Sequence, residues 1–196
     1  MNFLRKLFRK SEVVGRFVGR SKTRDIAITY RMGAGFMGEV NRAHPVSIEP
    51  GYPDATNPPT FFGCAVVVDG TSHNIRNLVA GDCTGDAIYG ILVRPFPIQQ
   101  QSTTNNGVVA TTGGYIAPPT NQAVDVCRSG YIKGPVQGTP AKGGRVYVWA
   151  AANSGSHVQG GFETAASTGN TFQLDEKSYF NGTKDANGVV EIGFNI

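Results

Sequence analysis

The sequence predicts a mainly β protein. We expect an antiparallel β-sandwich or barrel-like body (jelly-roll or β-tulip type) with an N-terminal amphipathic helix and an extended Gly/Pro-rich arm. Among the 196 residues, 26 are Gly and 11 are Pro, so turn formers are frequent. Charged residues make up only 16%, too few for a helical bundle, whereas 40% hydrophobic residues argue against a disordered chain. Short apolar runs broken by Gly, Pro, Asn and Thr are typical of strands joined by turns.

Residues 1–25 are predicted to form a basic amphipathic arm. Residues 1–24 hold eight Lys/Arg and one Glu, a net charge of +7, which leaves the rest of the chain at −3. Apolar residues recur at helical spacing on one side of this segment: Phe3, Leu4, Leu7, Phe8, Val14 and Val18. We expect this helix to dock on its own protein or on a neighbouring subunit. Alternatively, the helix binds an acidic surface of a partner protein. A membrane surface or nucleic acid is a further, less favoured alternative.

Residues 26–60 are predicted to be an extended Gly/Pro-rich segment without regular elements. A glycine-rich stretch at 32–38 is followed by five prolines between positions 45 and 59. Proline removes a backbone donor and fixes φ, which disfavours both helices and central strands. We expect this segment to run over a surface.

Residues 61–196 are predicted to form the β-rich body. The apolar run 61–68 predicts a buried strand that ends at Asp69-Gly70, a turn pair. A short strand and turn are expected at 78–82, and another strand at 86–94. The polar stretch 96–122 predicts a long exposed loop or hairpin tip.

Further strands are predicted at 123–128 and 145–151. Seven glycines and prolines between them indicate turns: Gly130, Gly134, Pro135, Gly138, Pro140, Gly143 and Gly144. The run 189–196 follows the hairpin signal Asn187-Gly188 and alternates with period two. One face of it is predicted to be apolar: Val190, Ile192, Phe194 and Ile196.

One motif suggests phosphate chemistry, because Gly33-Ala-Gly-Phe-Met-Gly38 matches GxGxxG. In such loops, bare backbone amides hold phosphate oxygens. A dinucleotide site needs a strand before the motif and a helix after it, but here His44-Pro45 and further prolines follow. We interpret the motif as a glycine-rich turn that lets the chain pass close to another surface, and we expect no cofactor.

The remaining reactive residues do not form a recognisable catalytic or metal-binding pattern. Asp69, Asp82 and Asp86 each adjoin a glycine, a turn context in which Asp caps the backbone. The three histidines lack ligand spacing, so we expect no metal site and no catalytic residues. Three widely spaced cysteines are predicted to be buried free thiols in a reducing compartment: Cys64, Cys83 and Cys127.

Four stretches together carry a resemblance to a known family. They are Tyr30–Pro45 with Glu49-Pro50, Gly63–Asp69, Gly81–Pro95 and Asp185–Ile196. The sequence resembles the head cement, or decoration, proteins of tailed bacteriophages over roughly residues 26–196, and Gly81–Pro95 is the most distinctive stretch. Such proteins are mostly β and often trimeric, and they clamp the outer capsid over junctions between major capsid subunits. The family typically begins near residue 30, so the resemblance assigns no role to residues 1–25.

The resemblance implies a non-enzymatic structural protein of the virion, present in the host cytoplasm during assembly. The implied partners are the major capsid protein and the chain itself, as a homotrimer. We expect no small-molecule substrate, nucleic acid or membrane partner. Contact residues are expected in segments that cannot form a core alone: Phe3, Leu4, Arg5, Lys6, Leu7, Arg9, Lys10, Arg31, Met32, Phe36, Met37 and Arg42.

Three other functions remain as alternatives. The first is a head fibre or adhesin module that binds a host surface through the 96–122 loop. The second is an enzyme that uses the glycine loop or a hidden carboxylate pair. The third is an anionic-membrane binder acting through residues 1–20.

Overall fold

The computed structural model describes residues 35–82, 88–95, 110–111 and 115–196, with the backbone alone at 110–111 and 115–116. The predicted N-terminal helix lies outside these residues, as does most of the polar excursion. Ala34–Ile196 forms one compact unit. Every regular element in the described part is a β-strand, which confirms the mainly β prediction. No helix suited to crossing a membrane occurs there.

Twelve strands follow one another along the described chain. They are β1 (Ser47–Gly51), β2 (Ala65–Val68), β3 (Ile75–Arg76), β4 (Gly90–Leu92), β5 (Ala110–Thr111), β6 (Tyr115–Ile116), β7 (Val124–Gln137), β8 (Tyr147–Trp149), β9 (Phe162–Glu163), β10 (Thr171–Gln173), β11 (Tyr179–Phe180) and β12 (Val189–Phe194). Ten of them form one sheet, with the main order β10-β8-β9-β7-β4-β2-β3. β5 and β6 form a separate pair.

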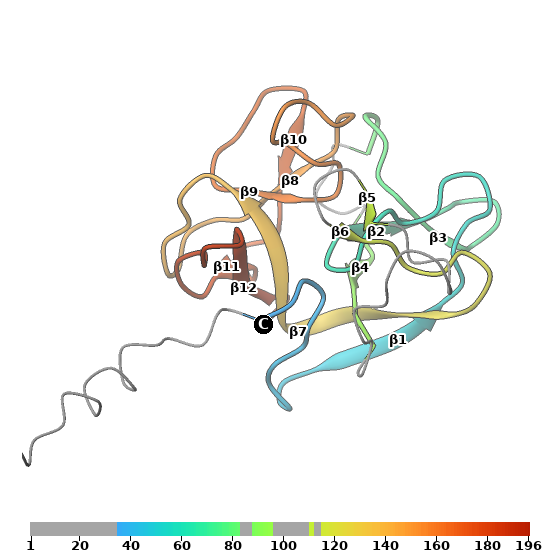
Figure 1. Ribbon diagram of the computed structural model, residues 1–196, viewed down its shortest axis with the longest axis horizontal. Helices are drawn as coiled ribbons and strands as arrows, with labels where there is room; N and C mark the ends of the chain where they lie inside the picture. Colours follow the sequence, from blue (N-terminus) through green and yellow to red (C-terminus); the bar gives the residue numbers. More distant parts are fainter. Residues whose placement is uncertain (1–34, 83–87, 96–109, 112–114) are drawn as a thin grey trace, which may run out of the picture. The chain divides into compact units, whose positions relative to one another are not determined.

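The 14-residue strand β7 organises this sheet. Its first half pairs with β1 on one edge and β4 on the other, because Cys127 faces both Ile48 and Ile91. Its second half pairs antiparallel with β12 and, at Val136–Gln137, parallel with β9. The sheet is therefore mixed rather than purely antiparallel. β7 bends between its two halves (Figure 1), and so the sheet curls.

Two glycines explain why β7 was predicted as a shorter strand followed by turns. Gly130 has φ +146°, a conformation that side chains rarely adopt, at the junction of the two halves. A Cβ on Gly134 would overlap the ring of Phe162. The turns predicted at Gly130, Gly134 and Pro135 are wrong, because these residues lie inside β7. A glycine in a strand permits close approach as well as a turn.

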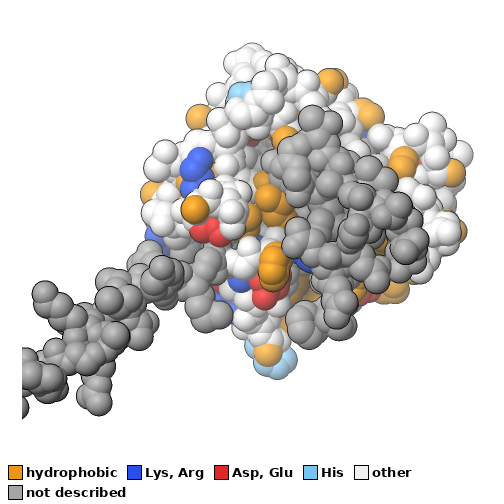
Figure 2. Space-filling view, viewed as in Figure 1, with side chains coloured by type: hydrophobic (Ala, Val, Ile, Leu, Met, Phe, Trp, Pro, Cys, Tyr) orange, Lys and Arg blue, Asp and Glu red, His pale blue; other side chains and the backbone are white. Residues whose placement is uncertain are grey.

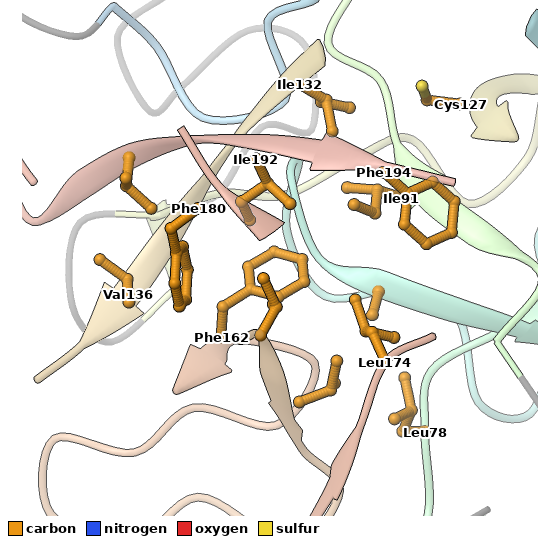
Figure 3. Packing of buried hydrophobic residues seen from close by; sticks show 14 of the residues in the cluster. Leu78, Ile91, Cys127, Ile132, Val136, Phe162, Leu174, Phe180, Ile192 and Phe194 are labelled. Atoms are coloured by element: carbon orange, nitrogen blue, oxygen red, sulfur yellow. The ribbon is translucent and has the colours of Figure 1, made fainter. Parts of the chain in front are cut away.

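Strand β2 is buried on both faces, as its continuous apolar run predicts. Ala65 and Val67 contact one buried cluster, whereas Cys64 and Val66 belong to a second cluster on the other face. The larger cluster gathers side chains from β7, β9, β11 and β12. Figure 3 shows Phe162 and Ile192 in the middle of this cluster, with Phe180 on one side of them and Phe194, beside Ile91, on the other. The predicted apolar face of β12 is confirmed for Val190, Ile192 and Phe194.

Two local predictions in the first half of the chain need correction. The 26–60 segment was expected to lack regular elements, yet β1 lies within it and pairs with β7. The short strand expected at 78–82 occurs earlier, as β3, and 79–82 is a turn closed by the Asp82 amide donating to Val79 O at 2.9 Å. Pro50 is tolerated in β1 because β7 is the only strand that pairs with β1 in the described part of the chain.

Candidate interaction surface

The described residues include three of the twelve predicted contact residues: Phe36, Met37 and Arg42. The other nine lie outside the described ranges: Phe3, Leu4, Arg5, Lys6, Leu7, Arg9, Lys10, Arg31 and Met32. The three described residues all lie in the segment that runs along β7 before β1. That segment is the basis of the candidate surface.

Phe36 is held outward on a tight glycine turn. Gly35 and Gly38 flank it with φ values of +104° and +79°. The Phe36 amide donates to Glu39 Oε2, and the Glu39 amide donates back to Phe36 O, each at 3.1 Å. The ring is 63% exposed, the highest exposure of any large hydrophobic residue described. The Arg94 guanidinium lies 4.7 Å from its centroid.

This turn is fixed to β7 by backbone and side-chain bonds. The Gly38 amide donates to Lys133 O at 2.7 Å, and Gly38 O accepts from the Arg94 amide at 2.8 Å. Lys133, whose side chain is only 11% exposed, places its Nζ 2.9 Å from Glu39 Oε2. A Cβ on Gly38 would meet backbone atoms of Arg94, Gly63 and Leu92 at about 3 Å. The turn is thus preorganised, and an exposed aromatic ring on it loses little freedom on binding.

These bonds also bear on whether the GxGxxG motif could bind phosphate. The Phe36 and Gly38 amides, which a phosphate would need, donate to groups of the protein itself. The described part of the motif, residues 35–38, is a turn in close contact with the chain around Leu92, Arg94 and Lys133.

Arg42 is tied to β12 rather than extended into solvent. Its NH2 group lies 2.8 Å from Glu191 Oε2, and its guanidinium lies 3.9 Å from the centroid of Tyr131. The hydrogen bonds to Glu191 raise the pKa of Arg42. Burial acts to raise the pKa of Glu191, but hydrogen bonds from Arg42, Asn181 and Asn41 outweigh it and lower that pKa. Arg42 therefore fixes the segment and offers the face of its guanidinium to the surface.

The sequence reading missed the exposed part of β1 and the residues beside it. Ile48 is 44% exposed and Tyr52 is 52% exposed. Next to them, the Tyr89 hydroxyl donates to Glu49 Oε2 at 2.6 Å, a bond that raises the pKa of Tyr89. The Arg128 guanidinium lies 3.7 Å from the Tyr89 ring centroid. The sequence of β1 has no period-two pattern, and Pro45, Pro50 and Pro53 before, within and after it indicated irregular chain.

Together these residues form one continuous stretch of chain, residues 36–52, which we call the strip. Three arginine–aromatic contacts lie within it or against it. Arginine and aromatic side chains are enriched in protein–protein interfaces and among their energetically dominant residues. Described Lys, Arg, Asp and Glu side chains form only small, separate groups on the face shown in Figure 2. In the strip itself, Glu39, Arg42 and Glu49 each form an ion pair with another residue of the chain, so the strip suits a protein partner better than a polyanion.

Other candidate chemistry is accounted for by local structure. Asp69 Oδ1 accepts from the amides of Thr71 and Ser72, and Asp82 pairs with Arg76 at 2.7 Å, so both carboxylates serve turns. Asp86 and Cys83 lie outside the described ranges. Burial raises the pKa of Cys64 to about 12 and that of Cys127 to about 11. Both thiols therefore stay protonated at neutral pH and are poor nucleophiles.

In the described part of the chain, no three His, Cys, Asp or Glu side chains are grouped to hold a metal ion.

Comparisons with known proteins found one family model and a similar solved structure. A family model described as XM1 gp53 minor capsid protein matches residues 26–194. Among solved structures, the chain is similar to one in a structure entitled "The capsid of Myoviridae Phage XM1", with a TM-score of 0.61 and 20% sequence identity. That similarity covers 86% of this chain and 95% of the other. No curated protein sequence matches.

Proposed function

The chain belongs to the XM1 gp53 minor capsid protein family, and from that premise we propose that it decorates the outside of a phage capsid and stabilises the shell. The resemblance to phage capsid-associated proteins, and hence location in the virion, is confirmed by this family match. In the proposed role the chain acts as a trimer over junctions between major capsid subunits. This role requires no catalysis.

The single observation that carries this proposal is the presentation of Phe36. The Phe36 side chain is 63% exposed, yet backbone hydrogen bonds and the Lys133–Glu39 ion pair hold its turn in place. Holding an apolar ring outward in one geometry costs stability and favours binding to a shaped pocket on a partner. The strip supplies further arginine–aromatic contacts around it. We propose that the strip, with Phe36 as its anchor, contacts the major capsid protein.

The repetition of identical binding sites on a capsid supports a role in holding capsid subunits together. A capsid displays the same binding site many times, and a trimer engages several sites at once. Modest individual contacts then give strong retention through effective concentration. Contacts that span two capsid subunits oppose their separation under internal pressure.

The test is binding of the purified chain to capsids that lack it. Phe36→Ser removes the anchor, and we expect affinity to fall at least about tenfold, as for a dominant interface residue. Val79→Ser is the matched control, because Val79 is 42% exposed and lies outside the strip. We expect the control to bind like the unmodified chain. Equal binding by both variants would remove the strip from the capsid interface.

A further inference from the structure

A cavity of about 340 Å³ lies at the far end of β7 from the β1 pairing. Its walls come from the last residues of β7, the loop before β9, β9 itself and the turn that leads into β12. Polar groups on the walls are Gln137, Ser156, Glu163, Lys184 and Asn187. The apolar part is formed by Pro135, Val136, Val158 and Phe162. A cavity of this size accommodates a long side chain or a small ligand.

Glu163 is the unusual group in this cavity. It is 6% exposed and is the one carboxylate among the described residues that is buried. Its Oε1 lies 2.7 Å from Nδ1 of His157, whose ring stacks on Trp149 with centroids 4.2 Å apart. No described residue donates a hydrogen bond to its Oε2, and this oxygen is not sealed from solvent. A buried carboxylate with spare acceptor capacity favours a cationic donor.

The rest of the cavity fits a basic side chain in particular. The apolar walls can cover the methylene stem of a lysine or arginine while its head group reaches Glu163. Lys184 is the one basic residue on the wall, and it is exposed and forms no ion pair with Glu163 within 4 Å. Lys184 can therefore turn toward water, whereas β-sheet pairing and His157 fix Glu163.

We propose that this cavity binds a lysine or arginine side chain from residues 1–24 of a second copy of the chain. Charge complementarity selects this occupant, because residues 1–24 carry a net charge of +7 and the remainder carries −3. The family match begins at residue 26, so residues 1–24 lie outside the matched region. The contact joins subunits of the proposed trimer. It thus rests on that part of the proposed function, and it is separate from the strip that meets the shell.

The test measures self-association of the full chain in solution by sedimentation velocity, without any capsid present. Glu163→Gln should weaken association at least about tenfold, since it removes one member of a buried charge pair. Lys184→Gln should strengthen association, because it removes a like charge from the cavity wall. Glu176→Gln, at a side chain 86% exposed, is the control and should change nothing. A synthetic peptide of residues 1–24 should compete with association and change the emission of Trp149, the single tryptophan.

Several results would overturn the proposal. Association that is equal in Glu163→Gln and the unmodified chain would exclude the cavity. Weaker association in Lys184→Gln would indicate an anionic occupant instead. A Trp149 response to the peptide without any self-association would indicate that the arm docks on its own chain. Because these measurements use no capsid, their outcome does not depend on whether the strip binds the capsid. The capsid-binding test with Phe36→Ser therefore remains a separate test.

Discussion

Gly134 shows how one absent side chain allows the core to close. At this position β7 passes directly against the Phe162 ring, and an added Cβ would overlap it. We expect Gly134→Ala to lower the free energy of unfolding by about 1–3 kcal/mol, because the core must shift to accept a methyl group. Chemical denaturation measures the change.

Gly70→Ala is the matched control, because no atom lies within 4 Å of the added Cβ and its φ is not in the left-handed region. Its free energy of unfolding should stay within about 0.5 kcal/mol of the unmodified value. A similar loss in both variants would mean that the Phe162 contact is not the cause.

Asp82 is a second residue with a testable effect, because its contribution to the stability of the fold depends on pH. Hydrogen bonds from Arg76 lower the pKa of this half-buried carboxylate. The Val79 amide, which donates to Asp82 Oδ2 at 2.7 Å, lowers it further. A carboxyl whose pKa is lower in the folded state stabilises the fold above its unfolded pKa of about 3.9. That stabilisation is lost as pH falls from there through the folded pKa.

We therefore expect Asp82→Asn to cost about 1–3 kcal/mol at pH 7 and progressively less as the pH falls below about 3.9. Thermal unfolding of both proteins at several pH values measures this difference. Glu176→Gln, at a carboxylate 86% exposed, should show a small and pH-independent effect. A cost for Asp82→Asn that is constant from pH 7 to pH 2 would contradict the assignment.

At the scale of elements, the glycine turn and β1 are attached to β7 as one edge. The Lys133–Glu39 ion pair holds the turn, and Lys133 is largely buried. We expect Glu39→Ala to increase the hydrogen-exchange rate of the Gly38 and Asn41 amides, which donate to Lys133 O and Tyr131 O. The reason is that an unpaired buried ammonium destabilises the docked turn.

The matched control is the double variant Glu39→Ala with Lys133→Met. It removes both charges, so exchange at Gly38 should return most of the way to the original rate. Equal exchange rates in the single and double variants would show that the ion pair does not hold the turn.

Some elements could be predicted because their signal is local. The continuous apolar run of β2 follows directly from its two buried faces. The alternation in β12 predicted the strand and the burial of Val190, Ile192 and Phe194, although Val189 and Gly193 on the other face are buried as well. β7 was predicted only in its first part, since Gly134 is required by a contact with Phe162, 28 positions away. β1 was missed because its prolines indicate irregular chain, and only pairing with β7 makes the segment a strand.

The candidate surface, like the fold, was predictable from the sequence only in part. Phe36 lies in a glycine-rich turn, and exposure of such a turn can be inferred from sequence. The partner of Arg42, Glu191, is 149 positions away, so no local pattern reveals that this arginine is tied down. Ile48 and Tyr52 carry no local signal for exposure, and residues on both faces of β1 are exposed, so no alternation along this strand reveals it.

At the scale of the whole molecule, the chain is a low-charge β body, and the strip is the surface that we propose for contact with the capsid. The curled sheet around β7 fixes the strip to the core through β1, β4 and β12. In the proposed decoration role, binding energy comes from many identical contacts rather than from one strong site. This role requires the chain to be present in a fixed, high ratio to the shell.

The most direct test of this central claim is the copy number of the chain in purified particles. Quantitative mass spectrometry against the major capsid protein gives that number. A decoration role predicts a constant ratio near one copy per capsid subunit, unchanged between preparations. A handful of copies per particle would contradict it and would favour a fibre or tail position.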